Sequence, residues 1–193
     1  GIPWWTTDIG GFFGADIRDP EFHELLVRWF QYGCFCPVMR MHGDRWPTQP
    51  QYGTTGGATC LSGAPNEVWS YTPEVLEILT EYLHLRENMR PYITEVMRQA
   101  HEKGTPVMRP VFYDFSNDSV CWDIENEYMF GPDVLVIPVT EQGCRRMRIY
   151  LPDGAVWTNA WTKEKFVGGQ WIYVDTPIEQ IPLFTKNGYQ LPL

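Results

Sequence analysis

The spacing of apolar residues changes part-way along this 193-residue chain. Up to about residue 115, stretches with a helical period alternate with short stretches typical of strands. After about residue 125 no helical period remains, and turn signals such as Gly168-Gly169 separate short apolar runs. The first pattern favours β/α units, and the second favours an all-β sandwich. We therefore predict an α/β part over residues 1–118 and an antiparallel β-sandwich over residues 119–193.

Local signals mark the beginnings and ends of helices in the first part. Asp19-Pro20 and Thr72-Pro73 each place a capping side chain before a proline at the first helical position. Apolar residues at helical spacing follow both pairs. We expect the first helix to end at Gly33, Pro91 to kink or split the second, and Gly104 to cap its last piece.

Strands are predicted over residues 2–7, 35–39, 106–115 and 134–139. Residues 43–72 are rich in Gly, Thr, Pro and Ser, and predict a long loop of a kind that is often functional. Residues 1–8 have the pattern of a buried strand entered in mid-course and not that of a signal peptide. We therefore expect the natural chain to begin far upstream.

Composition excludes several classes of protein. Hydrophobic residues make up 44% and charged residues 20%, which is enough to bury a core. The net charge of -9, with no basic stripe, argues against a nucleic-acid partner. No apolar run is long enough to span a membrane, so no membrane partner is expected. The five cysteines and four histidines lack the spacing of a metal site, so we expect free buried thiols, no metal and no cofactor.

Aromatic residues are unusually frequent, with nine Trp and ten Tyr. Several of them stand beside loop residues rather than in helical stripes. Aromatic faces suit the apolar C–H faces of sugar rings, which indicates a carbohydrate ligand. The simpler alternative for each of them is burial in the core.

Polar residues follow two of the predicted strands. Asp8 precedes the paired glycines at 10 and 11, and His42 follows the strand over residues 35–39. An Asp and a His at neighbouring strand ends could hydrogen-bond adjacent hydroxyls of one sugar. The alternatives are an Asx-type cap on the glycine turn for Asp8 and a core hydrogen bond for His42. No Ser or Cys nucleophile motif accompanies them.

These segments resemble glycoside hydrolase family 31, which contains α-glucosidases and α-xylosidases. The similarity extends in order along nearly the whole chain, through Trp5–Phe12, Arg28–Gly33, Pro37–Gly43, Leu85-Arg86, Pro91-Tyr92, Gly104–Pro110, Tyr128–Asp133, Ile181–Phe184 and Gly188.

The resemblance implies that the first part is the last β/α units of a (β/α)8 TIM barrel, followed by the proximal C-terminal β-sandwich. It implies substrate-binding roles in the −1 subsite: Asp8 and His42 contact the sugar, and Phe12 forms an aromatic wall. Arg40 is assigned no direct contact. The family's two catalytic Asp residues, a nucleophile and an acid/base, belong to motifs that are absent here and are expected upstream of Gly1.

The resemblance therefore implies part of a retaining, exo-acting α-glycosidase that removes terminal α-xylosyl or α-glucosyl residues from oligosaccharides. Its expected partners are the oligosaccharide and the missing N-terminal part of the same enzyme. The alternative is a non-catalytic carbohydrate-binding or scaffold fragment. The choice between xylose and glucose, the formation of a homo-oligomer and the compartment stay open.

Overall fold

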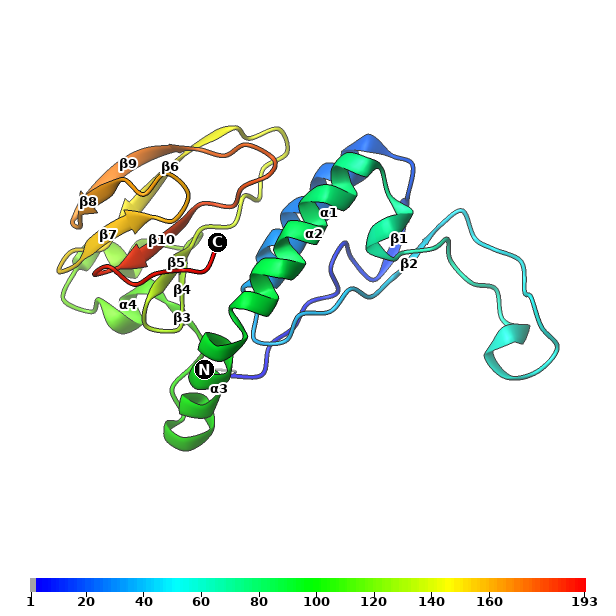
Figure 1. The fold of residues 1–193 in the computed structure, drawn as a ribbon, viewed down its shortest axis with the longest axis horizontal. Helices are drawn as coiled ribbons and strands as arrows, with labels where there is room; N and C mark the ends of the chain where they lie inside the picture. The colour runs from blue at the N-terminus through cyan, green and yellow to red at the C-terminus, as the bar shows by residue number, and fades with distance from the viewer. Residues whose placement is uncertain (1–2) are drawn as a thin grey trace.

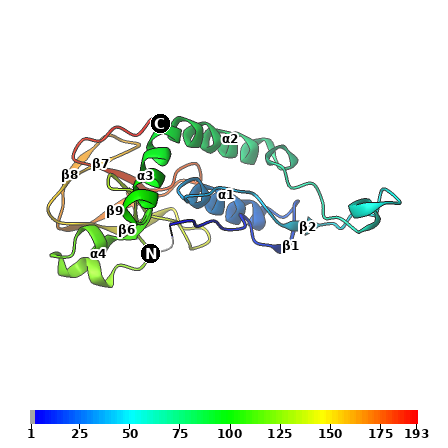
Figure 2. The same cartoon turned by 90° about the horizontal axis from the view of Figure 1, so that it is seen from below.

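The structure, a computed structural model, describes residues 3–193 (Figure 1). In both Figure 1 and Figure 2, α1 and α2 lie side by side at one end of the β-rich part. Among the described residues, no helix has the length and apolarity that a membrane span requires. The first part comprises β1 (Phe13–Asp16), α1 (Pro20–Cys34), β2 (Asp44–Trp46), 3-10 turns at Gly56–Thr59 and Val68–Ser70, α2 (Pro73–Asn88) and α3 (Arg90–Lys103).

The helices begin and break where the capping signals predict. The Asp19 side chain accepts a hydrogen bond from the Glu21 amide at 2.9 Å, and Thr72 caps α2 in the same way. Pro91 lies in the first turn of α3, so the second predicted helix is split after Asn88. Gly104 ends α3 with a φ of 69°. These parts of the prediction are confirmed.

Gly33 does not cap α1, and that prediction is wrong. The helix continues to Cys34, and Gly33 is buried inside its last turn. A Cβ at Gly33 would come within 2.6 Å of Ile9 Cδ1. The glycine therefore permits close packing of α1 against the segment that carries Asp8.

The predicted strands are shorter than expected or absent. Ile2 lies outside the described residues, and residues 3–7 and 35–39 are irregular. One backbone hydrogen bond joins these two segments, from Val38 N to the Trp5 carbonyl at 3.0 Å. Pro3 and Pro37 have no amide hydrogen to donate, which limits a ladder here. Within residues 106–115 only Met108–Pro110 is extended, because the chain turns into a short helix after Pro110.

The second part is built from antiparallel sheets. A six-stranded sheet has the order β3-β4-β5-β10-β7-β8, and β6 pairs with β9. Side chains from both sheets, including Leu135, Phe184 and Ile149, form one buried cluster around Trp157. Its elements are β3 (Met108–Pro110), α4 (Val111–Asp114), a 3-10 turn at Ser119–Asp123, β4 (Tyr128–Phe130), β5 (Val134–Val136), β6 (Arg146–Leu151), β7 (Val156–Asn159), β8 (Lys165–Val167), β9 (Gln170–Asp175) and β10 (Leu183–Lys186).

The two parts share a hydrophobic core, in which Leu26 and Leu79 of the helices join Val134 and Leu183 of the sheet. Arg28 of α1 adds a polar link. Its buried guanidinium donates to the carbonyls of residues 176, 177 and 180, at 2.6, 3.0 and 2.9 Å. The predicted boundary between residues 118 and 119 stays a prediction. β3, which lies before this boundary, pairs with β4, which lies after it.

Core burial does not explain most tryptophans. Among the described residues, only Trp157 is fully buried, and its indole N–H donates to the Pro152 carbonyl at 2.8 Å inside the sandwich. Six of the nine tryptophans are exposed: Trp4, Trp5, Trp46, Trp69, Trp122 and Trp171.

The prediction of buried thiols is partly wrong. All five cysteines are free, but Cys60 is exposed and Cys144 is half-buried, since both lie in loops.

Candidate functional site

The segments that carry the predicted site residues run side by side. β1 and β2 form a parallel pair joined through α1, as in a β/α unit. The Asp44 amide donates to the Phe12 carbonyl at 2.8 Å, and the Ile17 amide donates to the Trp46 carbonyl at 3.1 Å. Asp8 begins the tight turn before β1, where its carbonyl accepts from Gly11 N at 2.7 Å. Asp8, which precedes β1, and His42, which precedes β2, therefore lie on neighbouring segments.

Asp8 is ion-paired with Arg40. Arg40 Nη2 lies 2.7 Å from Asp8 Oδ1, and the two side chains are 51% and 27% exposed. Among the described residues, Asp8 Oδ2 has no partner. An ionised carboxylate offers about four lone-pair positions, so Asp8 can accept further hydrogen bonds while Arg40 holds it in place.

Phe12 and His42 are in contact. Their ring centroids are 5.2 Å apart with an interplanar angle of 41°, and Phe12 is 47% exposed. His42 is exposed as well. The pair offers an apolar ring face beside imidazole nitrogens that can donate or accept, which is the combination that a sugar ring and its hydroxyls require.

Arg45 is the buried residue that holds the two segments in this arrangement. Its side chain is fully buried, and it donates to the carbonyls of Gly11 at 2.9 Å and Ile9 at 3.1 Å. The guanidinium also lies 5.1 Å from the centroid of the Phe22 ring. Gly10 has a φ of +83°, and a Cβ there would come within 2.7 Å of Arg45 Nη2. A side chain at position 10 would therefore collide with the Arg45 guanidinium that binds this turn.

Comparison with known proteins decides the family. The Glycosyl hydrolases family 31 TIM-barrel domain matches residues 1–96, and the Glycosyl hydrolase family 31 C-terminal domain matches residues 104–191. The chain belongs to glycoside hydrolase family 31. The resemblance found in the sequence is thus confirmed, as is the order of a barrel segment before a C-terminal domain.

Similar members of family 31 include α-xylosidases and α-glucosidases. The α-xylosidase of Saccharolobus solfataricus is 36% identical over 193 residues, which cover 100% of this chain and 24% of that protein. Neutral α-glucosidase AB of Homo sapiens is 31% identical, over 100% of this chain and 18% of that protein. The solved structure of a family 31 α-xylosidase from a soil metagenome, complexed with xylose, has a TM-score of 0.93 and 49% identity, over 98% of this chain and 28% of that one. The chain spans between 18% and 28% of the length of these relatives.

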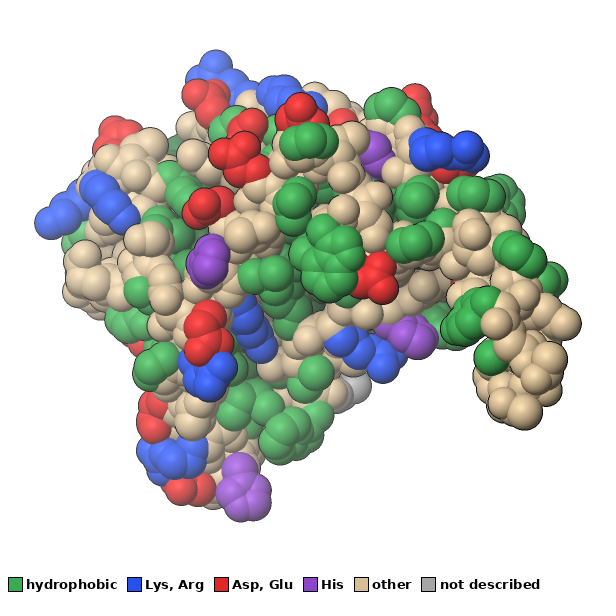
Figure 3. Space-filling view, turned by 45° about the vertical axis from the view of Figure 1, so that its right-hand side comes forward, with side chains coloured by type: hydrophobic (Ala, Val, Ile, Leu, Met, Phe, Trp, Pro, Cys, Tyr) green, Lys and Arg blue, Asp and Glu red, His purple; other side chains and the backbone are tan. Residues whose placement is uncertain are grey.

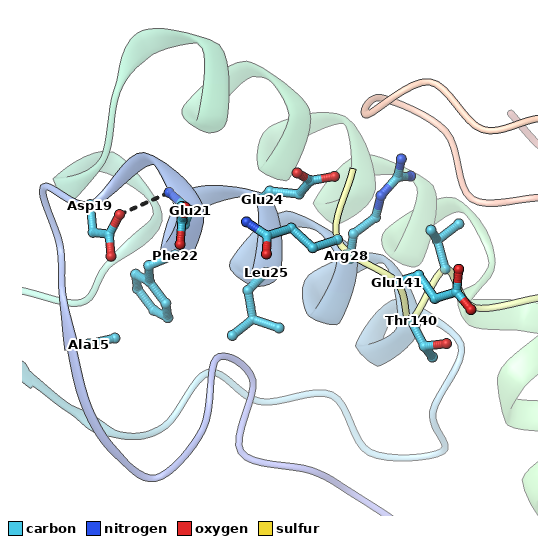
Figure 4. A pocket seen from close by; sticks show the side chains of 11 residues that line it. Ala15, Asp19, Glu21, Phe22, Glu24, Leu25, Arg28, Thr140 and Glu141 are labelled. Atoms are coloured by element: carbon cyan, nitrogen blue, oxygen red, sulfur yellow. Dashed lines mark hydrogen bonds between the residues drawn. The ribbon is translucent and has the colours of Figure 1, made fainter. Parts of the chain in front are cut away.

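Two hollows of this family 31 chain are lined by other residues than the predicted ones. One, of about 370 Å³, lies between the first turns of α1, near the Asp19 cap, and residues 139–142 (Figure 4). Another, of about 470 Å³, is lined by Trp29 and by residues 125–128. Neither includes Asp8, Phe12 or His42. Asp8, Phe12 and His42 therefore lie outside both of these hollows, on the exposed side of the two neighbouring segments.

Glu127, beside the second hollow, has a strongly perturbed pKa. The residue is 4% exposed, and burial raises its pKa to about 8. Its Oε1 accepts a hydrogen bond from the Tyr150 amide at 2.7 Å, and Oε2 has no partner among the described residues. Burial therefore favours the protonated form of this carboxyl group near neutral pH. The described residues contain no cluster of three or more His, Cys, Asp or Glu that could hold a metal ion.

Sequence reasoning missed two of these contacts. Arg40 received no role, although it lies only two residues before His42 in the sequence. That spacing was a usable signal. The burial of Arg45 had no such signal, because its carbonyl partners lie more than 30 residues away along the chain.

Proposed function

We propose that this chain is the C-terminal part of a retaining, exo-acting α-glycosidase that hydrolyses terminal α-xylosyl residues of oligosaccharides. The observation that carries the proposal is the adjacency of two segments in a family 31 chain, one bearing Asp8 and Phe12 and the other bearing Arg40 and His42. The choice of xylose is supported by similarity to proteins described as α-xylosidases.

In this proposal Asp8, Phe12 and His42 bind the terminal sugar in the −1 subsite. Asp8 accepts hydrogen bonds from hydroxyl groups through Oδ2, while Arg40 fixes its Oδ1. His42 hydrogen-bonds a neighbouring hydroxyl, and Phe12 packs against the C–H face of the ring. Arg40 is a positioning residue, because it acts through Asp8.

The proposal assigns bond cleavage to residues outside this chain. A retaining glycosidase needs two carboxyl groups about 5–5.5 Å apart, one nucleophilic and one acting as acid and base. Asp8 is already held by Arg40, and we assign it neither role. The pair belongs upstream of Gly1 in the same enzyme, together with the remaining walls of the pocket. Residues 1–118 then complete the barrel, and residues 119–193 form the proximal sandwich.

Hydrolysis of aryl α-xyloside and aryl α-glucoside by the full-length protein tests the proposal. We expect α-xyloside to be the better substrate, with retention of anomeric configuration. A strong preference for the glucoside would replace xylose by glucose and leave the glycosidase assignment intact. Absence of hydrolysis of both, in a folded protein that still binds oligosaccharide, would favour a non-catalytic carbohydrate-binding module instead.

A further inference from the structure

A projecting arm, residues 47–64, begins directly after β2. Figures 1 and 2 both show it extending away from the helices. A groove with a volume of about 550 Å³ runs along its base. The groove begins at Gly43, the residue after His42. Its polar lining comes from Asp44, Gln49, Tyr52, Ser62, Asn66 and Glu67.

The arm is tied to the segment that carries His42. Gln49 and Ser62 exchange backbone hydrogen bonds across its base, at 2.6 and 3.3 Å. The Ala64 amide then donates to the Arg45 carbonyl at 2.8 Å, and Asn66 Nδ2 donates to the Gly43 carbonyl at 3.3 Å. The position of the groove is therefore coupled to the position of the predicted sugar site.

The surface of the arm is neutral and polar, with exposed aromatic and aliphatic side chains. Residues 47–66 contain no charged residue. In Figure 3 the arm, at the lower right, shows tan and green atoms on the face in view. Tyr52 is 81% exposed and borders the groove. The two charged residues of the groove, Asp44 and Glu67, are acidic and lie at its base outside the arm. Carboxylates can accept hydrogen bonds from hydroxyl groups, and a ring face with hydroxyl and amide groups beside it suits a neutral saccharide.

We propose that the groove binds the sugar units that follow the terminal residue of the oligosaccharide, and that Tyr52 is a specificity-determining residue. This inference rests on the proposed function. One residue, Gly43, separates His42 from Asp44, so their Cα atoms are at most about 7 Å apart. A second sugar joined to one held at His42 can therefore reach the groove. Tyr52 offers it a ring face, and Gln49 and Asn66 offer it amide groups.

The experiment compares two substrates of the full-length enzyme in the variant Tyr52→Ala. α-Xylosyl fluoride carries no second sugar, whereas a xylosylated oligosaccharide does. Loss of one aromatic contact is worth about 0.5–1.5 kcal/mol, so we expect KM for the oligosaccharide to rise roughly 2- to 12-fold. The kinetic constants for the fluoride should change less than about 2-fold. Tyr173→Ala, which removes a tyrosine that is also exposed but lies on β9, serves as the matched control.

The other outcomes overturn the inference in distinguishable ways. Equal changes with both substrates, or no change with either, would show that Tyr52 does not contact a second sugar. A changed sedimentation coefficient with unchanged KM would identify the arm as an interface between copies of the enzyme. An inactive wild-type protein would refute the proposed function itself, and the inference with it.

Discussion

Replacing Arg40 by glutamine should damage substrate binding far more than folding. Arg40 donates to Asp8 Oδ1 at 2.7 Å, and half of its side chain is exposed. Exposed ion pairs contribute about 0–1 kcal/mol to stability because solvent screens them and the side chains lose entropy. We therefore expect Arg40→Gln to lower the free energy of unfolding by no more than about 1 kcal/mol.

The effect on catalysis follows from the role of Asp8. If Asp8 binds the terminal sugar, losing the charge-assisted hydrogen bond that orients it costs about 1.5–3 kcal/mol of substrate interaction. At about 1.4 kcal/mol per factor of ten, this lowers kcat/KM roughly 10- to 150-fold. Arg40→Lys should recover part of the loss, because lysine keeps the charge but lacks the planar geometry of arginine.

The assay measures kcat/KM for α-xylosyl fluoride and urea unfolding on the same preparations of full-length enzyme. The control is Arg90→Gln, because Arg90 pairs with Glu87 at 2.6 Å on an exposed surface where α2 meets α3. This variant should leave both measurements unchanged. An Arg40→Gln enzyme with unaltered kcat/KM, or one whose loss of activity follows a comparable loss of stability, would refute the reasoning.

Three further predictions concern buried groups. The pKa of Glu127 is raised from 4.5 to about 8, so its stability contribution is present below pH 4.5 and is lost as pH rises through 8. The free energy of unfolding of the wild-type protein should therefore fall between pH 5 and pH 8. Glu127→Gln should reduce this fall by at most about 5 kcal/mol. A variant with the same pH profile as the wild type would contradict the burial of that carboxyl group. Arg28→Met should lower the unfolding free energy by about 3–5 kcal/mol in urea titrations, because three backbone carbonyls lose their donor. Gly10→Ala should cost more than about 1 kcal/mol, since its φ is +83° and the new Cβ would crowd Arg45, and a neutral substitution would argue against this turn.

Helix boundaries could be predicted because their signals act over a few residues. Asp19 and Thr72 cap amides two or three residues away, and Pro91 interrupts a helix at its own position. The strands near Asp8 and His42 could not be predicted in the same way. Their hydrogen bonds require a partner segment far along the chain. Within residues 3–7 and 35–39 of the described part, one backbone hydrogen bond, from Val38 to Trp5, joins the two segments.

The candidate site was predictable in part. Alternation of strand and helix indicated that the ends of successive strands lie at one edge, which places Asp8 near the segment of His42. The contact of Phe12 with His42 and the Asp8–Arg40 pair join two segments whose backbones the buried Arg45 links through carbonyls of Ile9 and Gly11. No local pattern specifies a buried arginine whose acceptors are carbonyls of a distant turn, so these contacts could not be predicted from the sequence.

Competitive inhibition by free xylose tests most directly whether Asp8 and His42 bind the same sugar. The inhibition constant is measured for the full-length enzyme and for the variants Asp8→Asn and His42→Ala, with Arg90→Gln as the control. We expect Asp8→Asn to raise the constant at least about 10-fold, because the hydroxyl group loses a hydrogen bond to a charged acceptor. We expect His42→Ala to raise it roughly 2- to 12-fold, because one neutral hydrogen bond is lost. A constant that stays at the wild-type value in either variant would contradict the placement of that residue at the terminal sugar.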